Sequence, residues 1–340
     1  MRHSILPLLL GLVVTQVARS QEMSPGGIAT LWLGYRQGAS LVALSPDGQL
    51  LATAEARDKS DIRIWDVTTA RRRYTLKSHF ATAITFSPDG KLLVSAAESV
   101  VLLWDVQSGK QQGKLEVPIG SGWIDQLECL AFRPDGKRLV GAGAGAIRRD
   151  TGDEKCTVLI SWDAGTGKLI EFAKLDKEKI RLWLSADGGT LARLASAKGG
   201  KYFLRVRDLA NKKEFDVASK EPIDGPDYGV AVALSPDGKV AALGDKLWDV
   251  TTGKQLGTLW SAVPEPISYL CFSPDGKFVA AVRGAKKEST GLYEAKTGNV
   301  VFAFKAHGGK EVYSLAITKN GQTMPSVSED NTVKLWDLDP

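Results

Sequence analysis

The sequence predicts an all-β protein built from seven repeated units, each made of four short antiparallel strands. Three observations support this fold class: a Pro-Asp-Gly turn that recurs along the chain, a Trp-Asp pair that alternates with it, and nine Trp among 340 residues. Apolar runs rich in β-branched residues flank both motifs, as expected for short strands. Self-similarity at a spacing of about 40 to 50 residues is the signature of a repeat architecture.

The first motif is a four-residue turn that joins the first two strands of each unit. Pro presets φ at the first corner of the turn, and Gly accepts the left-handed conformation that closes a hairpin. Apolar runs such as Ala83–Phe86 and Leu92–Val94 lie on either side of each copy. The seven copies begin at Ser45, Ser87, Arg133, Ser185, Ser235, Ser273 and Thr318, and the last is degenerate.

The second motif ends the third strand of each unit. Five copies read Trp-Asp, whereas Arg207-Asp208 and Tyr293-Glu294 occupy the same place in units four and six. A tight turn such as Ser108–Lys110 follows and leads into the fourth strand. The five Trp-Asp copies begin at Trp65, Trp104, Trp162, Trp248 and Trp336.

Together these motifs resemble the WD-repeat β-propeller family over residues 28–340. The resemblance implies a seven-bladed β-propeller of four-stranded antiparallel blades around a central channel. It also implies that the Trp of the third strand packs between neighbouring blades, which accounts for the high Trp content.

Closure of the ring is expected to use the N-terminal strand. The chain stops at Pro340, directly after the third strand of unit seven. A spare apolar segment, Ile28–Trp32, precedes the first unit and matches the fourth-strand segment Gly257–Trp260. We therefore expect this segment to complete the last blade and to remove an exposed sheet edge.

Two histidines follow the N-terminal segment, and the resemblance gives both a structural role. In the family a buried His contacts a Ser or Thr, an Asp and the blade Trp. A Ser-His-Asp set also describes a hydrolase triad, but here the members fall at the family's buried positions. The two sets are His307, Ser326 or Ser328, Asp330 and Trp336 in blade seven, and His79, Ser95, Glu98 and Trp104 in blade two, where Glu replaces Asp.

Long connections gather on one rim of the expected ring. In unit three, 26 residues separate Gly136 from Trp162, against 10 to 19 in the other units, which predicts a long loop from about Gly143 to Cys156. Longer segments also precede units three and five, at 118–125 and 221–228. Aromatic, Arg and carboxylate side chains in such loops are typical of protein interfaces, and drifted loop length without a partner is the alternative. The candidate partner-binding residues are Trp123, Arg148, Arg149, Asp153, Asp227 and Tyr228.

Composition argues against several classes of function. Three widely spaced Cys do not make a disulfide framework, and no Cys or His pair has metal-ligand spacing, so neither metal nor cofactor is expected. Cys156, in the expected loop, is the thiol to test for reactivity. The net charge of +5 falls to +3 when residues 1–20 are removed, which is too weak to indicate nucleic-acid binding.

Residues 1–20 have the three-part pattern of a secretory signal peptide. Arg2 and His3 precede the apolar run Ile5–Val14, and small residues follow around Ala18. We expect a mature protein from about Gln21, with one propeller over 21–340, no membrane span, and a secreted or periplasmic location. Translation from Met23 would instead give a cytosolic protein.

These features predict a monomeric, extracytoplasmic and non-catalytic scaffold that binds an unknown protein or peptide through the rim loops of blades three to five. The alternative is an extracytoplasmic enzyme or small-ligand sensor that uses the central channel. Segments such as Trp162–Lys168 also resemble the repeats of quinone-cofactor propellers. A third possibility is a structural component of an envelope assembly, because propellers host many functions.

Overall fold

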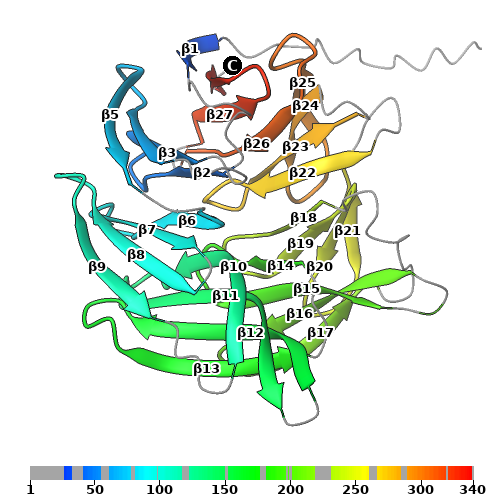
Figure 1. Ribbon diagram of the computed structural model, residues 1–340. Coiled ribbons are helices and arrows are strands. Elements are labelled where there is room, and N and C mark those ends of the chain that lie inside the picture. The colour runs from blue at the N-terminus through cyan, green and yellow to red at the C-terminus, as the bar shows by residue number, and fades with distance from the viewer. Residues whose placement is uncertain are drawn as a thin grey trace, which may run out of the picture.

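Seven four-stranded antiparallel sheets surround a central axis in the computed structural model, as Figure 1 shows. The predicted seven-bladed β-propeller is therefore confirmed. Within the part that the structure describes, no helix is long and apolar enough to cross a membrane. The structure describes residues 27–32, 41–54, 61–77, 81–97, 99–116, 122–149, 152–176, 181–196, 198, 201–218, 231–259, 266–284, 289–318 and 321–338.

The first four blades run from the innermost to the outermost strand in chain order. Blade one contains β2 (Leu41–Leu44), β3 (Leu50–Ala54), β4 (Ile62–Asp66) and β5 (Arg71–Leu76). Blade two contains β6 (Ala83–Phe86), β7 (Leu92–Ala97), β8 (Val100–Asp105) and β9 (Gln111–Glu116). Blade three contains β10 (Gly122–Phe132), β11 (Arg138–Arg149), β12 (Gly152–Asp163) and β13 (Leu169–Asp176). Blade four contains β14 (Leu182–Leu184), β15 (Thr190–Ser196), β16 (Tyr202–Asp208) and β17 (Glu214–Val217).

The last three blades close the ring. Blade five contains β18 (Val232–Leu234), β19 (Val240–Leu243), β20 (Lys246–Asp249) and β21 (Gln255–Thr258). Blade six contains β22 (Ile267–Phe272), β23 (Phe278–Arg283), β24 (Ser289–Glu294) and β25 (Val300–Phe304). Blade seven contains β26 (Val312–Leu315), β27 (Thr323–Ser328), β28 (Thr332–Asp337) and β1 (Gly27–Trp32).

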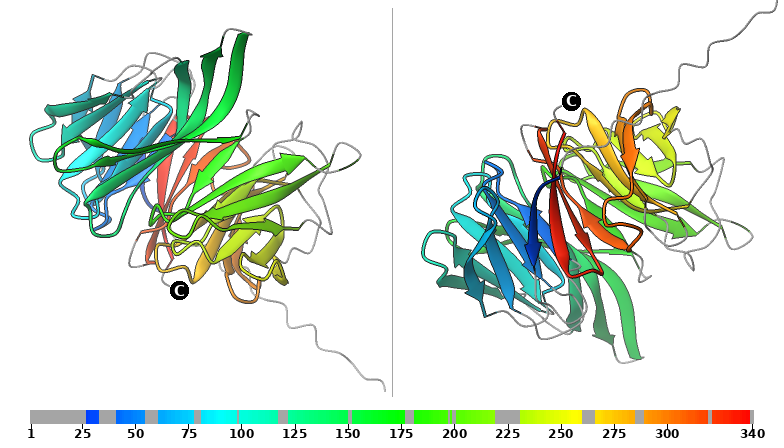
Figure 2. Two further views of the ribbon diagram at one scale, coloured as in Figure 1. Left: turned by 90° about the horizontal axis from the view of Figure 1, so that it is seen from below. Right: turned by 90° about the horizontal axis from the view of Figure 1, so that it is seen from above.

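The N-terminal strand completes blade seven, as predicted. β1 pairs antiparallel with β28, from Gly27 opposite Trp336 to Trp32 opposite Thr332. Figure 2 shows this blue strand beside the red strands of the C-terminal region. Strand pairing between the two ends of the chain therefore covers the edge that β28 would otherwise expose.

The recurring turns build near-identical hairpins. In blade two, Gly90 has a φ of 71° and its N–H donates to the Ser87 carbonyl at 2.9 Å. The Ser87 hydroxyl accepts from the Leu92 N–H at 2.9 Å and donates to the Asp89 carboxylate at 2.6 Å. Local hydrogen bonds of this kind explain why the turn positions were readable from sequence alone.

The apolar core lies between neighbouring blades. Each third-strand aromatic packs in a cluster shared with the preceding blade; Trp104, for example, joins Ile62 and Ile64 of blade one. This confirms the packing that the sequence predicted for these side chains. The exposed fractions are 6% for Trp65, 4% for Trp104, 0% for Trp162, 6% for Trp248, 1% for Tyr293 and 8% for Trp336.

Blade three contradicts the predicted loop between Gly143 and Cys156. β11 and β12 instead stay paired from Arg138 opposite Asp163 to Arg149 opposite Gly152. The Gly-Ala run of β11 fits because β10 approaches it closely: a Cβ on Gly143 would lie 2.1 Å from the Gln126 carbonyl oxygen. Small residues thus allow tight strand pairing here instead of a flexible loop.

The extra length forms a three-stranded projection, the blade-three arm, defined by residues 122–127, 144–149 and 152–157. Figure 2 shows these green strands extending beyond the rest of the ring. Cys156 lies within the arm, is 0% exposed, and has its thiol pKa raised by burial. The predicted position of Cys156 in a polar loop is therefore wrong, and its burial argues against a reactive thiol.

Candidate functional site

The blade-three arm holds four of the six candidate partner-binding residues. Trp123 of β10 lies opposite Ala146, and Arg148 of β11 lies opposite Asp153 of β12. Arg149 pairs with Gly152 next to the tip. The topology therefore brings these four residues into one three-stranded sheet. The other two candidates, Asp227 and Tyr228, lie outside the described residues.

Packing against blade two fixes the base of the arm. Ile124, Leu127 and Cys156 are buried in a cluster that also contains Val101 of blade two. The Thr82 hydroxyl of blade two donates to the Leu127 carbonyl at 2.6 Å. An apolar base with a cross-blade hydrogen bond holds the arm in one orientation, which lowers the ordering cost of binding a partner.

The three cysteines offer no activated nucleophile. All three are free thiols, and burial raises the pKa of each, in the case of Cys271 to about 12. Nucleophilic Cys residues require the opposite shift, towards the thiolate. Within the described ranges, no three His, Cys, Asp or Glu side chains form a group that could hold a metal ion.

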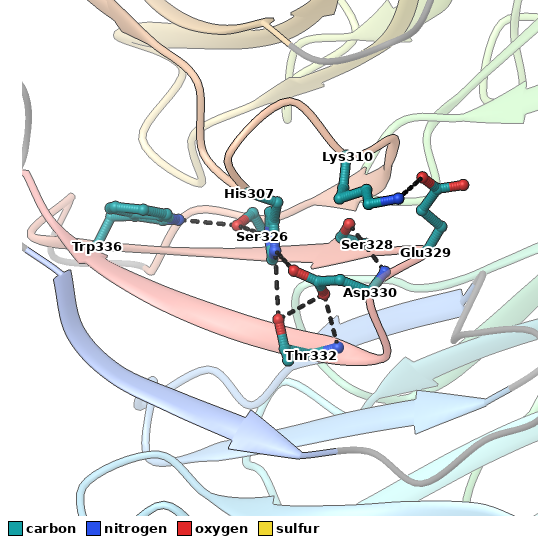
Figure 3. Close-up of polar contacts among 8 residues, drawn as sticks. All are labelled: His307, Lys310, Ser326, Ser328, Glu329, Asp330, Thr332 and Trp336. Atoms are coloured by element: carbon teal, nitrogen blue, oxygen red, sulfur yellow. Dashed lines mark hydrogen bonds and ion pairs between the residues drawn. The ribbon is translucent and has the colours of Figure 1, made fainter.

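A polar chain in blade seven links two strands to the segment before β26 (Figure 3). The His307 Nδ1 atom lies 2.8 Å from Asp330 Oδ2, and its Nε2 atom lies 2.8 Å from Ser326 Oγ. The Trp336 indole N–H donates to Ser326 Oγ at 2.8 Å. Ser328, the other candidate, instead accepts from the Asp330 N–H at 3.3 Å.

The environment favours a neutral His307 with its ring proton on Nδ1. The Asp330 carboxylate can only accept, so Nδ1–H donates to it, and in the neutral ring Nε2 then accepts from the Ser326 O–H. Burial lowers the pKa of His307, and its hydrogen bond to Asp330 offsets this only in part. Ser326 is 0% exposed, so its hydroxyl is closed to a substrate. The geometry fits a blade clamp, not a hydrolase triad.

Blade two shows part of the corresponding set. The Trp104 indole N–H donates to the buried Ser95 hydroxyl at 2.9 Å. His79 and Glu98, the other two members expected there, lie outside the described residues.

A groove between blades three and four was not predicted from the sequence. It encloses about 340 Å³ at the tight-turn end of the ring. A comparison of the repeats could have found it, because Arg133 stands where the other units have Ser or Thr. The groove is lined by Arg133, Arg138, Ser161 and Ile170 of blade three and by Leu209 and Lys212 of blade four.

Comparison with known proteins agrees with this architecture. The model of the WD domain, G-beta repeat, matches residues 70–105 and 298–337, which contain most of blades two and seven. The chain is 24% identical to human WD repeat-containing protein 90 over 92% of this chain and 19% of that protein. It therefore spans about a fifth of that relative's length.

Two plant proteins are similar at the same level. The chain is 25% identical to the small ribosomal subunit protein RACK1y of Oryza sativa subsp. japonica, over 91% of this chain and 95% of that protein. It is 23% identical to the WD repeat-containing protein WDS homolog of Arabidopsis thaliana, over 93% of this chain and 58% of that protein.

Proposed function

This chain belongs to the WD-repeat β-propeller family, and we propose that it is a non-catalytic scaffold that binds another protein or peptide. The relatives include a WD repeat-containing protein and a small ribosomal subunit protein, which supports a binding role over a catalytic one. The secretory pattern of residues 1–20 supports an extracytoplasmic location, with 21–340 as one monomeric propeller.

The length of the blade-three arm is the observation that carries this proposal. The strands β10, β11 and β12 have 11 or 12 residues, whereas the strands of the other blades have three to seven. A propeller needs no such extension to close its sheets. Extra strand length on a rigid base is therefore best explained by a contact that it makes with another molecule.

The residue types on the arm suit a protein partner. Trp and Arg are enriched where interfaces gain most of their binding free energy, and Trp123, Arg148 and Arg149 lie together on this sheet. Asp153, opposite Arg148, adds a carboxylate at the same end. Asp227 and Tyr228, which the sequence places between blades four and five, are also part of the proposal and lie outside the described residues.

The test is affinity capture followed by substitution. Partners cross-linked to the mature protein in an extracytoplasmic fraction are identified, and binding is then measured with the Trp123→Ala/Arg148→Ala/Arg149→Ala variant. We expect a loss of about tenfold or more in affinity with an unchanged melting temperature. The matched control is Arg71→Ala/Arg72→Ala, which removes two exposed Arg from β5 and leaves the arm intact. Equal affinity of the arm variant and the wild type would move the contact elsewhere.

The location is tested separately. N-terminal sequencing of the protein purified from the native host should give a mature chain that starts near Gln21. A chain that starts at Met1 or Met23 in a cytosolic fraction would contradict the extracytoplasmic part of the proposal and leave partner binding untouched.

A further inference from the structure

We propose that the groove between blades three and four binds an acidic peptide segment in which carboxylates alternate with aliphatic side chains. The groove lies among the turns that begin at Arg133 and follow Asp208, whereas the tip of the arm lies at the other end of β11 and β12. The two sites therefore use different surfaces, and separate variants test them.

The boundary that holds this groove differs from the other blade boundaries of the ring. At six of the seven blade boundaries a third-strand aromatic packs against the preceding blade. At the boundary of blades three and four, Arg207 takes that place and pairs with Glu214 at 3.6 Å. The cluster here, built around Val140, Leu159 and Leu191, is the one without an aromatic among the seven that the described residues form.

Blade three also departs from the repeat pattern at a residue that lines the groove, Ser161. Ser161 stands directly before the third-strand aromatic and is 2% exposed, and its Oγ has no hydrogen-bond partner. A buried hydroxyl without a partner is destabilising unless a ligand supplies one. The equivalent residues in the other six blades are the apolar Ile64, Leu103, Val206, Leu247, Leu292 and Leu335.

Two arginines also replace structural residues of the repeat. Arg133 occupies the turn position whose Ser hydroxyl closes the hairpin in blade two. Arg138 lies opposite Asp163, at the one such register position of the seven that carries a charge. The equivalents of Arg138 are Leu50, Leu92, Thr190, Val240, Phe278 and Thr323.

Blade four contributes a cation from a strained turn. Lys212 has a φ of 57°, a conformation that L-residues rarely adopt. Backbone strain of this kind concentrates where a side chain is needed at a fixed place. The equivalent residues are glycines in four blades, namely Gly109, Gly167, Gly253 and Gly298, and Ala70 in blade one.

The charged residues that line the groove indicate the charge of its ligand. Arg133, Arg138 and Lys212 face the groove with one carboxylate, Glu171, and none of the three makes an ion pair within 4 Å in the described part of the chain. The nearby Asp208 carboxylate already accepts hydrogen bonds from its own turn. Arg133 also helps to lower the pKa of Asp208, so part of its charge is already compensated. The groove still holds three cations against one carboxylate, which favours an anionic ligand, and Arg prefers carboxylates.

The apolar residues that line the groove indicate which other groups the ligand carries. A second hollow of about 610 Å³ adjoins the groove and shares Arg133, Arg138 and Ile170 with it. It adds Lys137 and two carboxylates, Asp135 and Asp163, which accept hydrogen bonds within their own turns. The floor is aliphatic, with Val140, Leu159 and the 45% exposed Ile170. Two adjoining hollows with an aliphatic floor and an excess of cations fit a peptide segment that has both carboxylate and aliphatic side chains. The backbone of such a peptide would also give the Ser161 hydroxyl a hydrogen-bond partner.

Titration with a synthetic probe tests the site. The hexapeptide acetyl-Gly-Glu-Leu-Glu-Leu-Gly-amide is added to the 15N-labelled mature protein, and amide chemical shifts are followed. We expect saturable shifts at Ser161, Ile170 and Leu209, and weaker binding at high ionic strength because the cations are partly exposed. A peptide with Gln in place of both Glu residues should bind with an affinity at least about tenfold lower. Equal binding of the two peptides, or shifts elsewhere in the ring, would overturn the proposal.

Variants that restore the repeat pattern provide the second arm. Arg133→Ser/Arg138→Leu resembles the other blades and should fold, yet we expect it to lose about tenfold or more in peptide affinity. Arg71→Ala/Arg72→Ala removes the same charge from blade one and should keep full affinity. Unchanged binding by the first variant would refute the site. A free aliphatic acid, 4-methylpentanoate, that bound as tightly as the peptide would refute the peptide assignment.

Discussion

Blade seven and the boundary of blades three and four fill the same architectural position in different ways. In blade seven, Trp336 is buried and hydrogen-bonded to Ser326, and His307 and Asp330 extend that chain. At the other boundary, Arg207 replaces the Trp and pairs with Glu214, and a groove lies between the same two blades. Both belong to one ring of repeats. The comparison therefore shows which residues stabilise the ring, such as Trp336, and which positions the ring can change without losing its fold, such as that of Arg207.

The largest expected effect comes from removing the blade-seven aromatic. Trp336→Ala leaves a cavity beside Phe304, whose ring centroid lies 4.6 Å away, and also leaves Ser326 without its donor. We expect a loss of about 3–5 kcal/mol in the free energy of unfolding, measured by urea denaturation. Arg207→Ala at the same position of blade four should cost about 1 kcal/mol or less, since it breaks a half-exposed ion pair. Equal losses would show that the two positions are equivalent.

Acid should weaken blade seven more than the boundary of blades three and four. The pKa of His307 lies below its ordinary value of 6.5, so the unfolded chain binds the extra proton first and stability falls as pH drops below about 6.5. Burial alone would raise the pKa of Asp330, but hydrogen bonds from Thr332 and His307 leave it below 3.8. Its contribution is therefore present above pH 3.8 and is lost as pH falls through the lowered pKa.

Melting temperatures between about pH 7.5 and pH 5.5 measure the His307 part of this effect. The slope for one proton is at most about 1.4 kcal/mol per pH unit. His307→Gln should be less stable at neutral pH and should show a smaller slope than the wild type. A slope that is the same in both proteins would contradict the neutral state assigned to His307.

A smaller effect is expected from the strained turn of blade four. Lys212→Gly relieves a positive φ and should raise stability by about 0.5–1 kcal/mol while it weakens binding of the acidic peptide. Ala70→Gly, at the equivalent turn of blade one, should give a similar gain with no change in peptide binding. A Lys212→Gly variant that kept full affinity would remove Lys212 from the site.

The ring was predictable because its determinants are local. Turn residues such as Ser87 and Gly90 make their hydrogen bonds within five residues, so the pattern marks each hairpin directly. Closure by Ile28–Trp32 was readable because the segment matches a fourth strand of the repeat. The clamp around His307 could be placed by resemblance to the family, although sequence left Ser326 and Ser328 as alternatives.

The arm and the groove were not predicted because they depend on tertiary pairing. The Gly-Ala run from Gly141 to Ala146 lacks the β-branched residues of a typical strand, and its strand state comes from β10 and β12 on either side. The groove joins residues from two units, such as Arg138 and Lys212, that are far apart in the chain. The sequence does carry a signal for the groove: several residues that differ from the other repeats face the same blade boundary. This signal becomes visible when the seven units are aligned on the structure.

One measurement tests most directly whether those departures serve binding instead of stability. The free energy of unfolding and the affinity for the acidic hexapeptide are determined together for Arg133→Ser/Arg138→Leu. We expect the variant to be at least as stable as the wild type, because it regains the turn hydroxyl and an apolar contact of the repeat, and to lose peptide binding. A variant that is less stable and still binds the peptide with wild-type affinity would contradict the account.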